Sequence, residues 1–470
     1  MPDIITDRPD LIIIRPAPEM QLKSWPTRRR FRNTLMRNIR AALGPIEHRI
    51  TVDQGRLLLH TTEIEASGRA LAQVFGVASF SPVDVVVRDP DLPTLKQAAE
   101  THFTEVVRGR TYAVRCKRHG GVKLSQREVE RQLGAVLNGP GRVDLDNPEV
   151  ELRIDLTEQG AWLFGRRFPG PGGVPLGVQD RALTLMSGGF DSAVAAWYTM
   201  RRGVGVDYVF CNLGGATHEN MVLHVAHRLA RDWAHGDRPR LYVVDFLPVV
   251  ADMRRRLPGE VWQVVLKRLM YRAAESLARE RKAQALVTGE ALSQVSSQTL
   301  SNLNSIDAAT DLPVIRPLIG FDKGEILSLA RRIGTYDLCE GVPEFCALSN
   351  SKPLVSSRRG RIDNEEAKLD HALLEQAVRE AREIDLLDME RAALAEPDVL
   401  LDAIPAGAEV IDCQPPRRYR DWHLPGATNV PPDELAQRFR RWPKDRHYLL
   451  YCLRGANAPV LAERMQQAGF

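Results

Sequence analysis

The alternation of apolar and polar positions changes character partway along the chain. Before about residue 170, short apolar runs such as LIIIR (11–15) and VELRIDL (150–156) stand between amphipathic helical stretches, which is typical of α+β domains. From about residue 178, apolar runs of strand length alternate regularly with helical segments. This alternation predicts βαβ units and a doubly wound parallel sheet.

These patterns divide the chain into four expected domains. We expect an N-terminal domain over residues 1–62, a second α+β domain over 63–170, a parallel-sheet domain over 178–395 and a small α/β domain over 398–470. A stretch rich in Gly and Pro, residues 168–177, marks the boundary before the parallel sheet. A charged stretch over residues 364–395 is predicted to be helical.

Composition adds size and charge to this picture. The chain has 470 residues, of which 44% are hydrophobic, and a formal net charge of +4. Several cores are expected from this length. The positive charge is concentrated in residues 25–40 and 110–123. Such clusters occur on ordinary solvent-exposed faces, and they are also compatible with binding to RNA phosphates without sequence specificity.

The cysteines and the N-terminal residues indicate the cellular compartment of the protein. The six cysteines include no CxxC pair, and no Cys–His spacing is typical of zinc, so no metal site of this kind is expected. The first residues lack the basic segment of a signal peptide, and no apolar run is long enough to span a membrane. We therefore expect a cytoplasmic protein in a reducing compartment.

The strongest motif is SGGFDS, residues 187–192, which lies between a predicted strand and a predicted helix. Its glycines allow close approach of the backbone to a ligand, and the helix N-terminus offers free N–H groups to phosphate. A plain strand-to-helix turn capped by Asp191 or Ser192 is the structural alternative. The motif fits neither the Walker A pattern nor the GxGxxG dinucleotide pattern.

SGGFDS resembles the PP-loop of ATP pyrophosphatases. The resemblance implies that ATP and Mg²⁺ bind here and that a substrate oxygen is adenylated. The implied phosphate cradle consists of Ser187, Gly188, Gly189, Asp191 and Ser192, with Asp191 helping to place Mg²⁺. Leu185 and Met186, on the preceding strand, would line the adenine pocket.

Three later stretches narrow the resemblance from PP-loop enzymes in general to one family among them. They are VLKRLMYRAA with Lys267, TGEALSQVSSQ with Gly289 and Gln298, and RPLIGFDKGEIL with Lys323. Either lysine alone would be an ordinary surface residue. In this order after SGGFDS, the stretches resemble the tRNA 4-thiouridine synthase (tRNA sulfurtransferase) family. The resemblance implies that Lys267, Gly289 and Gln298 contact ATP and that Asp191 and Lys323 are catalytic.

The N-terminal half carries the same resemblance. PEMQLKSWPTRRRF resembles the opening ferredoxin-like domain of that family. TYAVRCKRHGGVKLSQREVERQLG and VDLDNPEVELRIDL identify the expected domain over residues 63–170 as similar to a THUMP domain, which binds RNA. tRNA is therefore the implied partner. The candidate RNA contacts are Lys23, Arg28, Arg29, Arg30, Lys117, Arg118 and Lys123.

The last segment resembles a rhodanese domain. HLPGATNVP (423–431) followed by YCLRGANA makes Cys452 the implied persulfide carrier, and PEFC makes Cys346 the implied resolving thiol, with a Cys346–Cys452 disulfide after turnover. Gln414 replaces the usual arginine, and the sequence stops at Phe470, where the fold normally adds a strand. The other four cysteines are interpreted as structural.

The full implied reaction is ATP-dependent transfer of persulfide sulfur to uridine eight of tRNA. A cysteine desulfurase would supply the sulfur, and a sulfur-carrier protein of thiamine thiazole synthesis would be a second acceptor. Two alternatives stay open: a PP-loop enzyme that adenylates another RNA base, and a non-catalytic RNA-binding adaptor of sulfur relay. The oligomeric state is open as well, a homodimer among the options.

Overall fold

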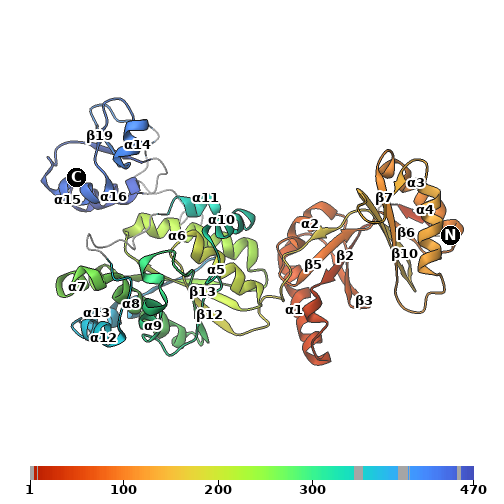
Figure 1. Cartoon of the computed structure of the whole chain (residues 1–470), viewed down its shortest axis with the longest axis horizontal. Helices are drawn as coiled ribbons and strands as arrows, with labels where there is room; N and C mark the ends of the chain where they lie inside the picture. The colour runs from red at the N-terminus through yellow and green to blue at the C-terminus, as the bar shows by residue number, and fades with distance from the viewer. Residues whose placement is uncertain (1–4, 8, 343–352, 390–400, 402, 453–456) are drawn as a thin grey trace. The chain divides into compact units, whose positions relative to one another are not determined.

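The computed structural model describes residues 5–7, 9–342, 353–389, 401, 403–452 and 457–470. The chain forms two compact units, Met1–Val178 and Gln179–Phe470 (Figure 1). Of the helices in the described part of the chain, none combines the length and the apolarity that a membrane-spanning segment needs.

The first unit contains a five-stranded sheet covered by two helices. The strand order is β11 (Phe168–Pro169), β5 (Val77–Pro82), β2 (Leu11–Pro16), β4 (Arg56–His60), β3 (Arg49–Asp53), and the helices are α1 (Trp25–Leu43) and α2 (Ile64–Leu71). Phe31, Leu35 and Ile39 recur at helical spacing along α1, so one face of this arginine-rich helix is buried in the core. Strand β5 extends this sheet past residue 62, where we expected the first domain to end.

A six-stranded sheet completes the first unit. The strand order is β1 (Ile5–Asp7), β6 (Val85–Val87), β10 (Gly160–Phe164), β9 (Val150–Thr157), β7 (Thr111–Arg118), β8 (Arg142–Val143), and the helices are α3 (Leu92–Val107) and α4 (Gln126–Leu137). The Arg56 guanidinium on β4 donates to Asp155 on β9 at 2.5 Å and also pairs with Asp53 at 2.6 Å. This buried arginine therefore ties the two sheets of the unit together.

The second unit is built on a six-stranded sheet that is parallel except at one edge. Its order is β16 (Val314–Ile315), β15 (Ala285–Val287), β12 (Arg181–Leu185), β13 (Gly205–Asn212), β14 (Arg240–Asp245), β17 (Arg382–Asp385). All eight residues of β13 are buried, as expected for a strand covered on both faces.

The helices of this unit run in two groups. The first is α5 (Phe190–Arg201), α6 (Gly215–Trp233), α10 (Lys323–Arg332) and α11 (Tyr336–Glu340); the second is α7 (Leu247–Arg256), α8 (Trp262–Glu280), α9 (Leu300–Asp307), α12 (Arg359–Glu366) and α13 (His371–Arg379). From β12 the chain moves through α5 to β13, and later returns through α8 to β15 on the other side of β12. Right-handed crossovers place these connections on opposite faces, so strand order reverses between β12 and β15. Ligands of open α/β sheets bind at such a point.

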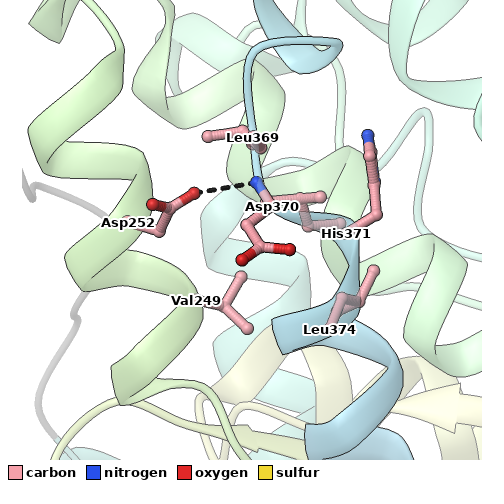
Figure 2. Close-up of a pocket in the computed structure, with 7 residues that line it drawn as sticks. Val249, Asp252, Leu369, Asp370, His371 and Leu374 are labelled. Carbon is pink, nitrogen blue, oxygen red and sulfur yellow. Dashed lines mark hydrogen bonds between the residues drawn. The ribbon is translucent and has the colours of Figure 1, made fainter.

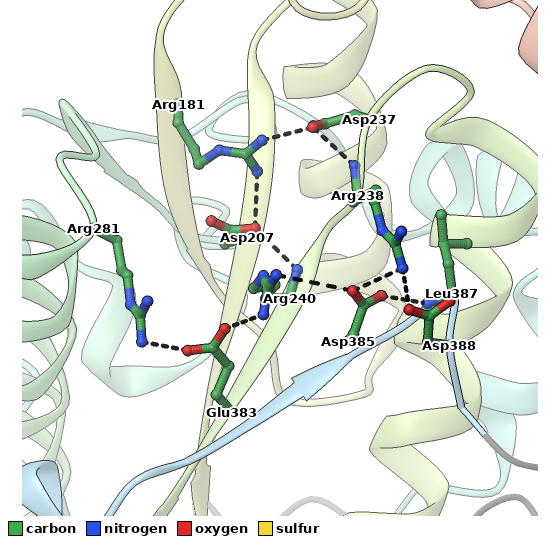
Figure 3. Close-up of polar contacts among 10 residues, drawn as sticks. All are labelled: Arg181, Asp207, Asp237, Arg238, Arg240, Arg281, Glu383, Asp385, Leu387 and Asp388. Atoms are coloured by element: carbon green, nitrogen blue, oxygen red, sulfur yellow. Dashed lines mark hydrogen bonds and ion pairs between the residues drawn. The ribbon is translucent and has the colours of Figure 1, made fainter.

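The charged stretch predicted as helix over 364–395 is only partly helical. It contains the end of α12 and all of α13, but Arg382–Asp385 forms strand β17, antiparallel to β14. Glu383 pairs with both Arg240 and Arg281, and Asp385 lies 3.1 Å from Arg238 (Figure 3). The ladder hydrogen bonds to β14, with these ion pairs beside them, outweigh the local helical preference of this segment.

Helix α13 is anchored to α7 on the same side of the sheet. The backbone N–H of Asp370 donates to Asp252 at 3.0 Å, and Val249, Leu369 and Leu374 lie around this contact (Figure 2). Asp252 also accepts from Arg256 at 2.7 Å, so the buried carboxylate is satisfied.

The final segment is a small three-stranded parallel sheet. Its order is β19 (Thr428–Asn429), β18 (Glu409–Asp412), β20 (Tyr448–Tyr451), with helices α14 (Pro416–Asp421), α15 (Pro432–Arg438) and α16 (Asn457–Gln467). Phe470 packs in this core, with its ring centroid 5.5 Å from that of Phe439. The expected fold class, a multidomain α/β chain with an α+β N-terminal half, a doubly wound sheet and a small α/β segment, is confirmed.

Candidate active site

The SGGFDS motif connects the end of β12 with the start of α5. Gly188 has a φ of +80°, and a Cβ there would lie 3.0 Å from Val222, so a side chain is excluded twice over. Ser192 Oγ donates to the Gly189 carbonyl at 3.0 Å and accepts from the Ser187 N–H at 3.3 Å. Gly189, the N-cap of α5, has no side chain to block the first N–H groups of the helix. The loop thus has a fixed shape at the helix N-terminus.

Asp191, in the first turn of α5, is contacted from two other elements. Lys323 Nζ lies 3.0 Å and 3.1 Å from its two carboxylate oxygens, and Gln294 Nε2 donates to it at 3.0 Å. Lys323 is the first residue of α10, whose N-terminus is fixed by a capping box of Asp322 and Glu325. The sequence pointed to Asp191 and Lys323, whereas it gave Gln294 no role.

Gly289 explains how the segment after β15 approaches the loop. A Cβ at Gly289 would lie 2.4 Å from the carbonyl carbon of Asp191 and 2.6 Å from the Ser192 nitrogen. Only glycine allows this contact between the segment after β15 and the first turn of α5 at the switch point. The two motifs that the sequence singled out are therefore in backbone contact.

Lys267 projects from α8 toward the same segment. Its Nζ donates to Glu290 Oε1 at 2.5 Å. Glu290 Oε2 accepts from three further groups: Tyr271 Oη at 2.8 Å, Thr288 Oγ1 at 3.1 Å and Arg316 Nε at 2.9 Å. Burial would raise the pKa of Glu290, but Lys267 and Arg316 outweigh it and hold that pKa at about 2. Arg316 and Tyr271 lie within the quoted stretches RPLIGFDKGEIL and VLKRLMYRAA, but the sequence gave neither of them a role.

Gln298 and the end of β12 supply less polar surroundings. Met186 is buried and Leu185 is half-buried, immediately before the loop. Gln298 is 7% exposed, and its Oε1 is buried with no hydrogen-bond partner among the described residues. A buried amide oxygen without a donor is costly, so this atom is a candidate acceptor for a donor that the structure does not contain.

His218 is another residue that the sequence did not indicate. It lies buried in the first turn of α6, with its ring edge-on to Phe210 at 4.8 Å. Burial lowers its pKa to about 4, an effect that the backbone of the phosphate-loop residue Ser187 opposes. The histidine is therefore neutral near pH 7 and supports the loop without adding charge.

The two cysteines implied in sulfur transfer, the carrier Cys452 and the resolving thiol Cys346, differ in how far the structure describes them. Cys346 and the implied Cys346–Cys452 pairing lie outside the described residues. Cys452 directly follows β20, is half-buried and packs against a cluster that includes Cys413. Burial raises the pKa of Cys413 and of Cys339 to about 12, so both thiols are protonated near neutral pH.

Gln414, where the resemblance leads one to expect arginine, is buried on the same sheet. Its N–H and Nε2 donate to Asp412 at 2.7 Å and 3.1 Å, and its carbonyl accepts from Asn429 at 2.8 Å. Asp412 also accepts from Tyr451, the neighbour of Cys452. Gln414 thus takes a place in the hydrogen-bonded support of the strand end that carries the thiol.

The seven candidate RNA contacts are all exposed, but they are not equivalent. Arg28 donates to the carbonyls of Gln21 and Lys23, and Arg30 donates to the Val178 carbonyl at 3.1 Å. Arg29 lies over the Trp25 ring at 5.6 Å. Arg118, at the end of β7, donates to a neighbouring carbonyl at 3.3 Å. Lys23, Lys117 and Lys123 are exposed lysines with mobile ammonium groups.

No group of three or more metal-ligating side chains occurs within the described ranges. Mg²⁺ is commonly held by one or two carboxylates together with substrate phosphates, so a site of that kind needs only Asp191. The donor set at the loop is compatible with such an ion.

Comparison with known sequences covers the chain from near its start to its end. Residues 177–371 match the family described as "Thiamine biosynthesis protein (ThiI)" and residues 11–81 match the "ThiI ferredoxin-like domain". Residues 90–165 match the THUMP domain, and residues 396–470 match the rhodanese-like domain.

Similarity to individual proteins extends over nearly the whole length. The tRNA sulfurtransferase of Pyrobaculum aerophilum is 36% identical over 98% of this chain and 95% of its own. That of Azotobacter vinelandii is 37% identical over 97% of this chain and 98% of its own. A crystal structure of a 4-thiouridine synthetase–RNA complex with bound ATP is 30% identical, covers 80% of this chain and 98% of its own, and superposes with a TM-score of 0.69. The resemblance inferred from the motifs is confirmed: the chain belongs to the tRNA sulfurtransferase family.

Proposed function

We propose that this protein uses ATP to replace the O4 oxygen of a tRNA uridine, at position eight, with sulfur from a persulfide. The observation that carries the proposal is the joining of the SGGFDS loop, Gly289 and Lys323 at the switch point of the sheet. The related 4-thiouridine synthetase, solved with RNA and ATP, supports it.

The residues at the switch point suit a bound nucleotide. The phosphates would lie on the backbone of Ser187, Gly188, Gly189 and Ser192 at the start of α5, where N–H groups and the helix dipole favour anions. Leu185 and Met186 provide an apolar surface for adenine. Gln298 Oε1 would accept from the exocyclic amino group of adenine, which resolves its missing hydrogen bond. Lys267 and Gly289 complete the site.

Asp191 and Lys323 are placed for the adenylation step. The uridine O4 attacks the α-phosphorus of ATP, the bond to pyrophosphate breaks, and the carbonyl oxygen becomes part of an AMP leaving group. The Lys323 ammonium, held 3.0 Å from Asp191, would stabilise the charge that develops on the phosphates. A Mg²⁺ ion held by Asp191 and the phosphates would supply further charge neutralisation.

Sulfur transfer follows at the activated carbon. A Cys452 persulfide attacks C4, AMP departs, and a disulfide joins Cys452 to the new sulfur. The Cys346 thiolate then attacks the Cys452 sulfur, which releases the thiolated uridine and leaves a Cys346–Cys452 disulfide. An external thiol reduces that disulfide and restores both thiols.

The remaining partners follow from the same scheme. A cysteine desulfurase would load Cys452 with sulfur. The first unit, with domains that we propose to be ferredoxin-like and THUMP, would bind tRNA through its exposed lysines and arginines. The description "Thiamine biosynthesis protein" of the matched family supports a second role as sulfur donor to a carrier protein of thiazole synthesis.

The proposal is tested by measuring pyrophosphate release with and without unmodified tRNA, in the absence of a sulfur donor. We expect tRNA-dependent release by the wild type and none by Asp191→Ala. A non-catalytic RNA-binding adaptor would release no pyrophosphate at all. An enzyme acting on another base would still release pyrophosphate with a tRNA whose uridine eight is replaced by cytidine.

A further inference from the structure

We infer that Glu290 is a positioning residue for ATP: its buried carboxylate orients the Lys267 ammonium, and Tyr271 and Arg316 act on the nucleotide only through Glu290. The inference deepens the proposed function and rests on it, since it takes Lys267 to be the residue that contacts ATP.

The two oxygens of Glu290 have different surroundings. Oε2 accepts three hydrogen bonds, from Tyr271, Thr288 and Arg316, and is therefore saturated. Oε1 faces Lys267, whose Nζ lies 2.5 Å away. The carboxylate cannot rotate without breaking the bonds at Oε2, so Oε1 gives the ammonium one fixed position.

The anchor of this carboxylate reaches a further helix. Arg316, directly after β16, donates Nη1 to Asp307 at the end of α9 at 3.1 Å and Nη2 to Tyr271 Oη at 3.2 Å. Tyr271 lies one helical turn after Lys267 on α8. The segment after β16 and helix α8 are thereby both bonded to the carboxylate of Glu290, which lies just after β15.

Charge balance explains why a carboxylate is needed here. The side chains of Lys267, Arg316 and Glu290 are 20%, 12% and 5% exposed, so two cations are largely withdrawn from water beside one buried anion. Without the negative charge of Glu290, the Lys267 ammonium would face Arg316 with only Asp307 to offset them. Lys267 would then lose its orientation.

The location gives this arrangement a route to the nucleotide. Glu290 directly follows Gly289, which is in contact with the backbone of Asp191 and Ser192. The ammonium has three N–H bonds, and Glu290 occupies one. The others can serve a phosphate, and the fixed carboxylate determines where they point. Because the pKa of Glu290 is held at about 2, the carboxylate stays ionised and takes no part in proton transfer.

A double-mutant cycle on ATP binding by the full-length protein tests the inference. We expect Glu290→Gln to weaken ATP binding by roughly 10- to 100-fold, as for loss of a hydrogen bond to a charged group. We expect Lys267→Met to weaken it similarly. In the Lys267→Met background, Glu290→Gln should add less than about 2-fold, because its effect passes through the missing ammonium.

Two further variants separate positioning from stability. Glu366 is a buried carboxylate that pairs with Arg268 and Arg272 on the same helix, α8. Glu366→Gln should lower Tm and leave ATP affinity within about 2-fold. Tyr271→Phe removes one donor to Oε2 and keeps the charge, so it should fold and weaken ATP binding by a few-fold only. Glu290→Asp, which keeps the negative charge, should restore part of the ATP affinity that Glu290→Gln loses.

The outcomes distinguish this inference from the proposed function. Weakened binding in Lys267→Met together with unchanged binding in Glu290→Gln would refute the inference alone. Equal effects of Glu290→Gln in both backgrounds would also refute it, because the carboxylate would then act independently of the ammonium. Unchanged ATP binding in Lys267→Met would overturn both the nucleotide site and the inference.

Discussion

Lys323 Nζ lies 3.0 Å and 3.1 Å from the two carboxylate oxygens of Asp191, a residue 132 positions earlier in the chain. The contact joins the N-terminus of α10 to the first turn of α5. The side chains of Lys323 and Asp191 are 42% and 26% exposed, so the pair is open to a ligand. An exposed pair of this kind adds little stability, and a role in chemistry accounts better for its position at the phosphate loop.

Removing the lysine should therefore affect catalysis far more than folding. We expect Lys323→Ala to lower tRNA-dependent pyrophosphate release by about 10²- to 10³-fold, as for loss of a group that stabilises transition-state charge. Its Tm should change by no more than a few degrees. Lys368→Ala, which removes an exposed lysine paired with Glu365 on the surface, is the matched control and should retain full activity. Near-normal pyrophosphate release by Lys323→Ala would show that the lysine is not catalytic.

Gly289 offers a steric test of the switch point. We expect Gly289→Ala to abolish ATP binding, because its Cβ would lie 2.4 Å from the Asp191 backbone and would displace the start of α5. Gly320→Ala in the same unit is the control, since a Cβ there meets no atom within 4 Å. Equilibrium titration with ATP measures both variants, and equal affinities would contradict the close approach.

The sulfur relay predicts unequal roles for two cysteines on neighbouring strands. Cys452→Ala should end thiolation with a persulfide donor while leaving tRNA affinity unchanged, because the sulfur-carrying atom is lost. Cys413→Ala removes the buried thiol that lies beside Cys452 and should keep the activity, at some cost in stability. Thiolated tRNA is quantified by mass spectrometry. Normal turnover by Cys452→Ala would exclude Cys452 as the carrier.

The sequence located the loop residues of this site better than the residues that support them. SGGFDS is a local pattern that suits phosphate binding, and Gly289 and Lys323 were assigned to the site through the resemblance of their stretches to the tRNA sulfurtransferase family. Tyr271 and Arg316 lie within the quoted stretches, but they converge on Glu290 only through the sheet topology, which the sequence does not show. His218 was missed for a similar reason, because its relation to the loop exists only in the fold.

The prediction of element boundaries failed where pairing with a distant strand overrode the local preference of a segment. Residues 382–385 have a charged sequence compatible with a helix, but pairing with β14 makes them a strand. Strand β5 likewise belongs to the first sheet because of its long-range partner β2. The parallel sheet was predictable, since continuous apolar runs such as β13 have few alternatives.

The contacts of the basic residues in the first unit predict which of them bind RNA phosphates. Lys23, Lys117 and Lys123 are exposed lysines, so changing each to Gln should weaken tRNA binding uniformly across sequences. Each should also reduce the slope of log K against log salt by about 0.7 to 0.9 if it contacts one phosphate. Arg30 donates to the Val178 carbonyl, and Arg30→Gln should instead lower stability. An unchanged salt slope in the triple lysine variant would place the tRNA elsewhere.

His218 predicts a pH dependence of stability in the second unit. Burial lowers its pKa from 6.5 to about 4, so the folded state holds the neutral ring while the unfolded chain takes up a proton below pH 6.5. Its stabilising contribution is complete above pH 6.5 and is lost as the pH falls toward 4, by up to roughly 1.4 kcal/mol per pH unit. His218→Phe should flatten the fall of Tm between pH 6.5 and 4, whereas His371→Asn, at an exposed position, should not.

The central claim is that this chain adenylates and then thiolates a tRNA uridine. The most direct measurement is mass spectrometry of unmodified tRNA incubated with the protein, ATP, a persulfide donor and a thiol reductant, with AMP quantified in the same reaction. The account predicts 4-thiouridine at position eight and one AMP for each sulfur inserted, with both lost in Asp191→Ala. Formation of 4-thiouridine without AMP, or of AMP without any thiolated uridine, would contradict it.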